Sequence, residues 1–256
     1  MSTAESPARD EGNSAAADLQ AGLTRLAGLV ADSLGLAQVL AEVAASAVRA
    51  VPGADGVGVT LMHGEHGERA VVASAASAPF VTELDEIQYG LVQEGPGVTA
   101  AEVGRTVWSG SLGGDQSWPR FGPRAGRLGV HSALALPLIV SERVVGAITV
   151  YAYGKDSFDE HAAAFGELFA TPAAVAAHNA RILAEALALT DQLQTALLTR
   201  PVIDQAIGII RSRTGRSASE SFDQMRTLSQ AENRKLAEVA ERIVDKAVRR
   251  ARARRS

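Results

Sequence analysis

The chain has 256 residues, 46% of them hydrophobic, which is enough for a buried core and for about two domains. It contains no cysteine, which excludes disulfides, thiolate nucleophiles, Cys-bound zinc, iron–sulfur clusters and thioether-linked chromophores. Residues 200–256 carry 14 Lys and Arg against 7 Asp and Glu (net +7), whereas the preceding 199 residues carry 11 against 22 (net −11). This split predicts an acidic body and a basic C-terminal module with a polyanionic partner.

The first 17 residues are rich in Ser, Ala, Glu, Asp and Gly, a composition that predicts a disordered arm. They lack the basic stretch followed by an apolar stretch that marks a secretory signal. No apolar run approaches the roughly 18–20 residues that span a bilayer. We therefore expect a cytoplasmic protein without a membrane partner.

Residues 18–180 alternate between helix-like and strand-like apolar spacing, with Val51-Pro52-Gly53 and Ser141-Glu142-Arg143 as turns. A capping box, Ser157-Phe158-Asp159-Glu160, begins a long helix rich in Ala and Leu. The pattern predicts an α+β domain whose sheet is flanked by helices. The expected elements are helices over 18–34 and 36–50, strands over 56–62 and 69–76, short helices over 81–92 and 99–104, a weak strand over 106–109, a helix over 117–128, and strands over 131–140 and 144–153.

Five motifs in this region together resemble the GAF domain, a bacterial sensor and dimerisation fold. They are Ala54–Val59, Leu84–Tyr89 leading to Glu94-Gly95-Pro96, Ser117–Phe121, Ser132–Leu138 and Val145–Tyr151. The resemblance implies an antiparallel sheet flanked by helices that binds a small molecule or a protein signal. Relatives of this subtype often carry Cys after Glu-Gly-Pro, whereas this chain has Gly97, which argues against thiol-based sensing.

Residues 181–199 are expected to form a helix that connects the two modules. Its apolar stripe has heptad spacing, which predicts a dimeric coiled coil; the alternative is a helix lying on its own domain. Pro201 disturbs a continuous helix, and with Thr199 as a cap it would make 199–201 a hinge. The stripe consists of Ile182, Ala186, Leu189, Leu193, Ala196, Arg200 and Ile203.

Three amphipathic helices are expected after residue 200. The first is Val202–Ile210; the second follows a capping box, Ser217-Ala218-Ser219-Glu220; the third, Arg234–Arg254, is capped by Asn233. Phe222 and Met225 have the spacing of core residues rather than of a base-stacking surface. A bundle of this size buries little surface, so dimerisation or attachment should stabilise it.

The segments Ile203–Ile210, Ser219–Arg226 and Ser229–Ala240 resemble the ANTAR domain, the RNA-binding three-helix module of bacterial transcription antiterminators. The order GAF then ANTAR is itself known in that family. The chain departs from the family pattern at three positions. Ile207 stands where a Lys commonly precedes the glycine matched by Gly208, Arg211 stands at a common Met position, and Pro201 is unusual at the helix entry.

An RNA partner requires cations for phosphates and polar groups for bases. Arg211 could replace the cation missing at 207, and the small residues Ala206 and Gly208 indicate either close helix packing, which we favour, or close approach of RNA. The Arg-rich end, 248–256, is either a salt-sensitive contributor to affinity or a solvated terminus. The predicted RNA-binding residues are Arg211, Arg213, Arg216, Arg226, Ser229, Asn233, Arg234 and Lys235.

The sequence contains no motif for catalysis. It lacks a phosphate-binding loop, a nucleophile elbow and a zinc-protease motif, and its histidines lack metal-ligand spacing; His63 and His66 lie in a Gly-rich turn. We therefore predict neither catalytic nor metal-ligating residues, no cofactor and no enzyme activity, and the ligand-binding residues of the GAF-like domain stay unknown.

The resulting hypothesis is a signal-responsive antitermination regulator, a homodimer whose C-terminal domain binds a hairpin in nascent RNA. Its expected parts are a disordered arm (1–17), a GAF-like sensor (18–180), a connecting coiled-coil helix (181–199), a three-helix ANTAR domain (200–247) and a basic tail (248–256). The alternative is a dimerising ligand-binding or protein-interaction module without specific RNA binding.

Overall fold

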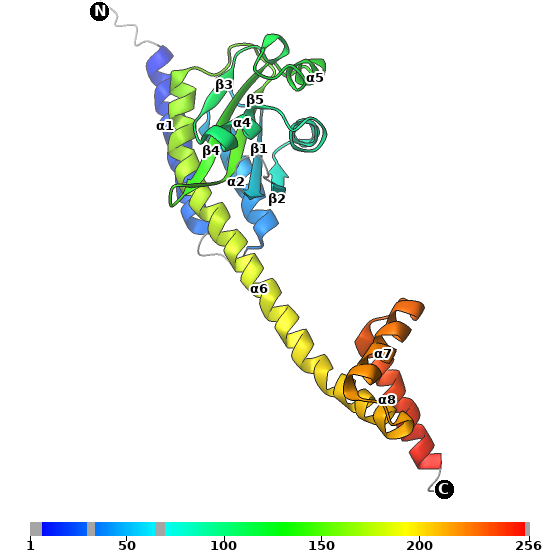
Figure 1. Ribbon diagram of the computed structural model, residues 1–256. Helices are drawn as coiled ribbons and strands as arrows, with labels where there is room; N and C mark the ends of the chain where they lie inside the picture. The colour runs from blue at the N-terminus through cyan, green and yellow to red at the C-terminus, as the bar shows by residue number, and fades with distance from the viewer. Residues whose placement is uncertain (1–6, 30–33, 65–69, 254–256) are drawn as a thin grey trace, which may run out of the picture. The chain divides into compact units, whose positions relative to one another are not determined.

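The computed structural model describes residues 7–29, 34–64 and 70–253, and its contacts divide the chain into two compact units (Figure 1). The first unit is Met1–Ala184 and the second is Glu185–Ser256. The division lies close to residue 180, where we expected the sensor to end. The segment expected to connect the two modules divides at the same point, since 181–184 belong to the first unit and 185–199 to the second.

An antiparallel sheet of five strands forms the centre of the first unit, in the order β2-β1-β5-β4-β3. The turn between β4 and β5 places Ser141 and Glu142 at φ 48° and 64°, the left-handed conformation that a two-residue hairpin requires. The predicted alternation of strands and helices is confirmed. The strands are β1 (Gly56–His63), β2 (Ala70–Ala76), β3 (Val107–Ser109), β4 (Ser132–Val140) and β5 (Arg143–Ala152).

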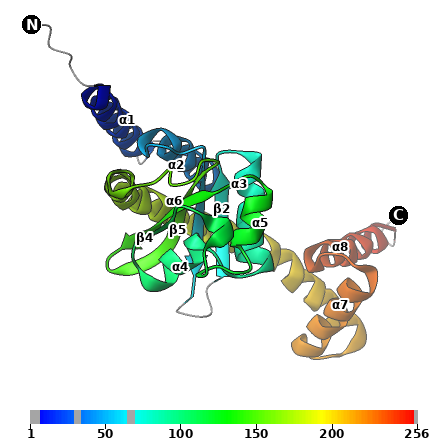
Figure 2. The same ribbon diagram turned by 90° about the horizontal axis from the view of Figure 1, so that it is seen from above.

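One face of the sheet is covered by α1 (Pro7–Leu29), α2 (Leu36–Ala50) and the first part of α6 (Glu160–Thr214), as Figure 2 shows. Alternate residues of β1, β4 and β5 point to these helices, as the two-residue period of a strand requires. Leu40, Leu136 and Phe169 are among the fully buried side chains of this layer. It is the larger of the two apolar layers of the first unit.

The opposite face carries shorter helices around Trp118, Phe121 and Tyr151, all buried. The segment expected as one helix over 81–92 is an α-helix that widens into a π-helix after Asp85. The elements of this face are α3 (Pro79–Asp85), the π-helix η1 (Glu86–Leu91), α4 (Pro96–Val103), the 3₁₀ turn η2 (Leu112–Gly114) and α5 (Gly122–Arg127). Residues of the first three line the cavity described below.

Two predictions, one about the N-terminal arm and one about the start of α6, are wrong. Residues 7–17 of the expected disordered arm belong to α1, whose later residues Leu19 and Leu26 are buried in the helical layer. The long helix begins at Glu160 but is not capped by Ser157. The carboxylate of Asp159 instead accepts from the backbone N–H of Ala162 at 2.8 Å, because an aspartate directly before the helix satisfies a free donor of the first turn.

The helix α6 is continuous through Pro172 and Pro201, so the expected hinge at 199–201 is not present. Each proline removes one backbone donor, but a helix of 55 residues keeps its other hydrogen bonds and can relieve the clash by a slight bend. Neither α6 nor any other helix in the described part of the chain is apolar enough to cross a membrane.

In the second unit, the end of α6 packs with α7 (Ala218–Glu232) and α8 (Leu236–Ala253) around Ala206, Ile210, Met225 and Ala240. Val239 is also buried, and Phe222 packs against this core as predicted. The expected tail is helical up to Ala253.

The caps of α7 confirm one prediction and correct another. The capping box at Ser217 is confirmed, since Ser217 and Glu220 exchange both hydrogen bonds. Asn233, however, does not cap α8. It ends α7 in the left-handed conformation (φ 49°), which asparagine tolerates because its short polar side chain bonds locally.

Candidate functional site

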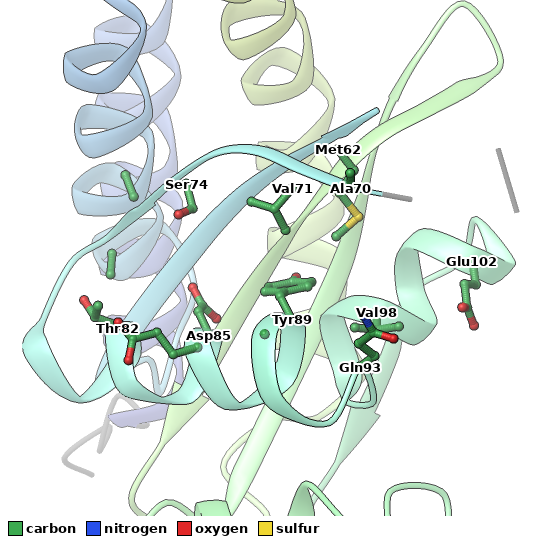
Figure 3. Close-up of a pocket in the computed structure, with 14 residues that line it drawn as sticks. Met62, Ala70, Val71, Ser74, Thr82, Asp85, Tyr89, Gln93, Val98 and Glu102 are labelled. Carbon is green, nitrogen blue, oxygen red and sulfur yellow. The ribbon is translucent and has the colours of Figure 1, made fainter. Parts of the chain in front are cut away.

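A cavity of about 720 Å³ lies between the β2 edge of the sheet and the segment from α3 to α4 (Figure 3). Figure 3 shows Asp85 and Tyr89 extending from the helical segment towards the strands, with Met62 and Val71 opposite them. Its volume lies in the range of about 300–1,000 Å³ typical of small-molecule pockets. It is lined by Met62, Ala70, Val71, Ser74, Ala75, Ala76, Thr82, Asp85, Glu86, Tyr89, Gly90, Gln93, Val98 and Glu102.

The π-helix positions the polar residues of this cavity. Its wide turn closes with a hydrogen bond of 2.9 Å from the Val92 N–H to the Ile87 carbonyl. The next residue, Gln93, has φ 52°, a left-handed conformation that costs a non-glycine residue about 1–2 kcal/mol. Both irregular features, the π-turn and the strained Gln93, are of a kind often found where a backbone serves a binding site.

Asp85 lies at the centre of a buried polar network. Its Oδ1 accepts hydrogen bonds from the Tyr151 hydroxyl at 3.2 Å and from Gln88 Nε2 at 3.3 Å. Gln88 Nε2 also donates to the Tyr151 oxygen at 3.1 Å, while its Oε1 accepts from the Gly97 N–H at 2.8 Å. The network therefore joins the π-helix, strand β5 and the start of α4. Within the described residues, Asp85 Oδ2 accepts no hydrogen bond.

Two glycines leave the space that this network occupies. A Cβ at Gly58 in β1 would collide with Asp85 Oδ2, and a Cβ at Gly97 would collide with the Tyr89 hydroxyl and the Thr149 Oγ1. The same packing accounts for the glycine that follows Glu-Gly-Pro, because a cysteine at 97 would need the space held by Tyr89.

Burial raises the pKa of the Asp85 carboxyl from 3.8 to about 7, and the hydrogen bonds from Tyr151 and Gln88 offset only part of that rise. Burial and the neighbouring Asp85 charge also raise the pKa values of Tyr151 and Tyr89. The hydroxyls of Thr149 and Thr60 act on Tyr89 in the opposite direction, although its buried hydroxyl makes no hydrogen bond of good geometry. A carboxyl of this kind changes charge near neutral pH.

None of these cavity residues was identified as functional from the sequence. The segment Leu84–Tyr89 carried part of the GAF resemblance, but its sequence does not show that Asp85 is buried. An aspartate in a helical segment usually faces water. Only the close approach of Gly58 and Tyr151, which are distant in sequence, makes it an interior group.

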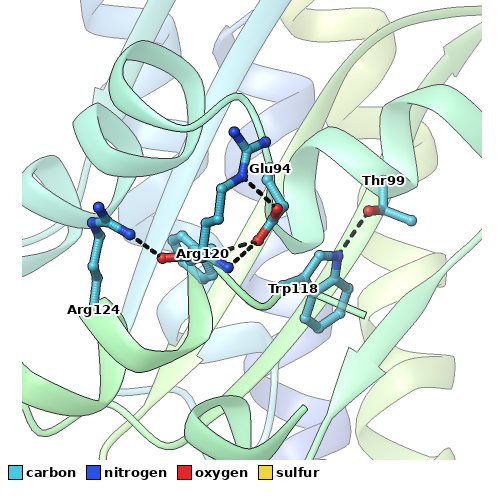
Figure 4. A network of polar contacts seen from close by, with 6 residues as sticks. Glu94, Thr99, Trp118, Arg120 and Arg124 are labelled. Atoms are coloured by element: carbon cyan, nitrogen blue, oxygen red, sulfur yellow. Dashed lines mark hydrogen bonds and ion pairs between the residues drawn. The ribbon is translucent and has the colours of Figure 1, made fainter. Parts of the chain in front are cut away.

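The motif residues Glu94 and Ser117–Phe121 form a second network, shown in Figure 4. Glu94 accepts from the backbone N–H of Arg120 at 2.7 Å and of Phe121 at 3.0 Å, and pairs with the Arg120 guanidinium at 2.9 Å. Partial burial would raise the pKa of Glu94, but these hydrogen bonds lower it below its usual value. Trp118 Nε1 donates to Thr99 Oγ1 at 2.9 Å. These motifs therefore hold the α4 segment in place beside the cavity.

The eight residues predicted to bind RNA lie on the second unit, and all are exposed except the half-buried Ser229. They fall into two groups at opposite ends of α7, with Arg226 between them. Because α7 has 15 residues, the two ends are about 20 Å apart. The first group precedes α7 and consists of Arg211 and Arg213 in the last turn of α6 and Arg216 in the loop after it. The second group lies at the end of α7 and just after it, and consists of Ser229, Asn233, Arg234 and Lys235.

Some of these side chains already have partners. Arg226 pairs with Asp223 at 3.0 Å, and the Arg216 guanidinium donates to Gln224 Oε1 at 2.9 Å. The Ser229 hydroxyl donates to the Arg234 carbonyl, so its proton is engaged in the turn. Within the described part of the chain, Arg211, Arg213, Arg234 and Lys235 make no ion pair, which leaves these charges open to a phosphate.

The structure explains the unusual residue at 207. Ile207 is half-buried against the core of the second unit, so the position that commonly holds a cation here contributes to packing. Of the two small residues beside it, Ala206 is fully buried, as close packing predicts. Gly208 is exposed, and a Cβ there would meet nothing within 4 Å, so the packing interpretation is wrong for Gly208.

The heptad stripe on α6 is largely exposed in the single chain. Ile182 is 49% exposed, and Leu189 and Leu193 are 57% exposed. The alternative of a helix lying on its own domain therefore does not hold between 182 and 193. Ile203, at the end of the stripe, packs into the core of the second unit.

No group of three or more His, Asp or Glu able to hold a metal ion is found in the part of the chain that the structure describes. His63, from the Gly-rich turn, is exposed at the end of β1. His66, the other histidine considered there, lies outside the described residues.

The sequence profile of the GAF domain family matches residues 33–178, more than half of the chain. The chain belongs to the GAF domain family. The profile of the ANTAR domain matches residues 191–244, so the predicted order of a GAF domain followed by an ANTAR domain is confirmed. No curated protein matches the sequence of the chain.

Solved structures resemble the sensor unit. The GAF domain of a phosphoenolpyruvate-protein phosphotransferase from Coxiella burnetii is 21% identical, with a TM-score of 0.50 over 65% of this chain and 96% of that one. The corresponding domain from Acinetobacter is 16% identical (TM-score 0.46, 65% and 97% covered). A free methionine-R-sulfoxide reductase from Neisseria meningitidis is 20% identical (TM-score 0.47, 64% and 91% covered). The first of these confirms the predicted α+β, GAF-like fold.

We predict that Glu94→Ala lowers the free energy of unfolding by about 2 kcal/mol, because it leaves the backbone donors of Arg120 and of the buried Phe121 without an acceptor. Arg120→Ala removes only the exposed guanidinium and should cost less than about 1 kcal/mol. Urea denaturation of both variants measures the difference. Equal losses would mean that the ion pair, rather than the backbone contacts, carries the effect.

We also predict that Asp85→Asn removes part of the pH dependence of stability. Between pH 3.8 and about 7 the folded carboxyl holds a proton that the unfolded chain releases, so its contribution falls as pH rises through this window. Across this window the stabilisation that Asp85 contributes to folding falls by about 4 kcal/mol. The free energy of unfolding of the Asn variant, measured by urea denaturation, should therefore rise relative to that of the wild type between pH 4 and pH 8. Glu83→Gln, on the same helix outside the cavity, is the control; a wild-type curve parallel to that of Asp85→Asn would contradict the prediction.

Proposed function

We propose that the protein is a signal-responsive transcription antitermination regulator that binds a hairpin in nascent RNA through its ANTAR domain, under control of its GAF domain. The match of residues 191–244 to the ANTAR family supports the kind of regulator. The observation that carries the RNA partner is the set of exposed cations without ion pairs on this three-helix bundle. A regulator of nascent transcripts acts in the cytoplasm.

The placement of these cations favours a structured RNA. The two groups lie before and after α7, whose ends are about 20 Å apart, and this spacing suits phosphates separated by several nucleotides of a folded hairpin. Phe222 packs in the core and cannot stack on bases, so guanidinium groups would supply stacking as well as charge. The exposed Gly208 leaves the α6 backbone near Arg211 open to close approach.

The exposed stripe on α6 supports a homodimer. Leu189 and Leu193 present apolar surface at heptad spacing on a helix that extends through both domain matches. Contiguous exposed apolar surface of this kind marks an interface, and a two-stranded coiled coil would bury it. A dimer would bring two RNA-binding domains together and raise their effective concentration for a second hairpin.

We infer no catalytic role, because both matched domains are of regulatory families. The alternative, a dimerising ligand-binding or protein-interaction module with weak RNA binding, draws support from one observation. Ile207 stands where the family commonly has a cation and packs against the core, so this position offers no phosphate contact. The two experiments below separate the candidates.

Equilibrium binding of the full chain to a tandem-hairpin RNA, at two salt concentrations, tests RNA recognition. Arg234→Ala with Lys235→Ala should weaken hairpin binding by at least about tenfold and make the salt dependence shallower by about 2 in log–log slope. The matched control is Arg249→Ala with Arg250→Ala, which removes the same charge from the last turns of α8. Wild-type binding no tighter than to duplex DNA, or equal losses in both double variants, would refute the RNA proposal.

Sedimentation equilibrium tests the dimer. Leu189→Lys with Leu193→Lys should convert a dimer into a monomer, because like charges would meet across the seam. Asp191→Lys with Gln192→Lys, exposed off the stripe, is the control and should leave the mass unchanged. A wild-type monomer would contradict the dimer, whereas a dimer whose mass is indifferent to added hairpin RNA would favour the alternative module.

A further inference from the structure

The cavity of the GAF domain has a charge character of its own. Three carboxylates line it, Asp85 at its base and Glu86 and Glu102 on exposed positions of the π-helix and α4. Among its described lining residues there is no Lys, Arg or His. Among these described residues an anionic ligand would therefore meet like charges and no compensating cation, which disfavours nucleotides, phosphorylated sugars and carboxylic acids.

Asp85 is the buried carboxyl of this cavity, and one of its two oxygens accepts no hydrogen bond from the described residues. The residue is only 8% exposed, Oδ1 accepts from Tyr151 and Gln88, and Oδ2 accepts from none of the described residues. An interior carboxylate without a cation is costly, and a positively charged ligand would remove that cost. The pKa of this carboxyl is raised for the same reason, because burial disfavours its charged form.

The rest of the wall suits an apolar body attached to a cation. Tyr89 lies next to Asp85 along the cavity floor, and Met62, Val71 and Val98 supply apolar surface around it (Figure 3). The face of a tyrosine attracts an ammonium group, and the effect grows where water is excluded. The polar groups of Ser74 and Gln93 add hydrogen-bond capacity without charge.

We propose that this cavity binds a small organic cation, an amine with a compact apolar body whose ammonium group lies between the Asp85 carboxylate and the Tyr89 ring. The inference deepens the sensor role given above and rests on it for its biological meaning. The binding itself is independent of RNA. It distinguishes this chain from a sensor of anionic metabolites by the charges of the cavity alone.

Isothermal titration calorimetry of the full chain tests the proposal with pairs of equal shape and opposite charge. The probes are phenethylamine against 3-phenylpropionate, tryptamine against indole-3-propionate, and cyclohexylamine against cyclohexanecarboxylate, at pH 8, where Asp85 is ionised. At least one amine should bind, and each amine that binds should do so at least tenfold more tightly than its acid. Binding by none of the amines, or an acid bound as tightly as its amine, overturns the proposal.

Two variants locate the binding. Asp85→Asn keeps the size of the side chain and should weaken amine binding about 10- to 100-fold, the loss expected for a hydrogen bond to a charged group. Glu83→Gln removes the same charge from α3 outside the cavity and should leave the affinity unchanged. Unchanged affinity in a folded Asp85→Asn variant overturns the proposal.

A third variant decides the matter if Asp85→Asn does not fold. Val71→Trp fills the cavity from the half-exposed strand β2, and it should abolish amine binding while circular dichroism shows a folded chain. Full amine affinity in this variant overturns the proposal. Hairpin RNA binding of the same preparations, without amine, is measured separately. If the chain binds hairpin RNA but no amine, the proposed function stands and this inference is wrong. If it binds an amine but not the RNA, this inference stands and the proposed RNA-binding function is wrong.

Discussion

The burial of the Asp85 carboxylate beneath strand β1 is the constraint around which the sensor domain is arranged. Its position requires glycine at 58, places Tyr151 of β5 within hydrogen-bond distance, and engages Gln88, which in turn holds the N–H of Gly97 at the start of α4. The widened π-turn provides this geometry, because it brings Gln88 within hydrogen-bond distance of Tyr151 in β5 and directs Tyr89 towards the strands, as Figure 3 shows for Tyr89. One interior charge thus fixes the positions of three elements and the cavity between them.

The second domain shows how packing and charge divide a small helical surface. Its core is narrow, so a half-buried position such as 207 gives more stability as isoleucine than as a cation. The cations lie instead where the chain turns, before and after α7. In the turn after α7, the Ser229 hydroxyl donates to the Arg234 carbonyl and Asn233 adopts the left-handed conformation that ends the helix. Charge at these turns does not disturb the core. A basic surface can therefore vary in individual residues while the bundle keeps its fold.

The sequence predicts most of the fold because local patterns determine it. The alternation along β4 and β5, the capping box at Ser217 and the core spacing of Phe222 and Met225 all report interactions between near neighbours. The errors arise where neighbours compete or distant contacts decide. Asp159 is a better cap than Ser157, Asn233 ends one helix rather than beginning the next, and a long helix tolerates Pro201. Asp85 could not be identified because its burial depends on Gly58 and Tyr151, which only the sheet brings near.

The sheet also offers a physical connection from the cavity to α6. In β5, Tyr151 faces the Asp85 network, while Ile148 and Val150 on the other face pack in the layer that contains Phe169 of α6. A ligand that changes the charge of Asp85 therefore acts on a strand whose opposite side packs in the same apolar layer as the helix carrying the proposed dimer seam. Such contact alone does not make a switch. The ligand must bind two arrangements of that helix with different affinity, since a ligand that binds both equally shifts neither. A sensor of this design consequently depends on how differently the two arrangements bury Asp85.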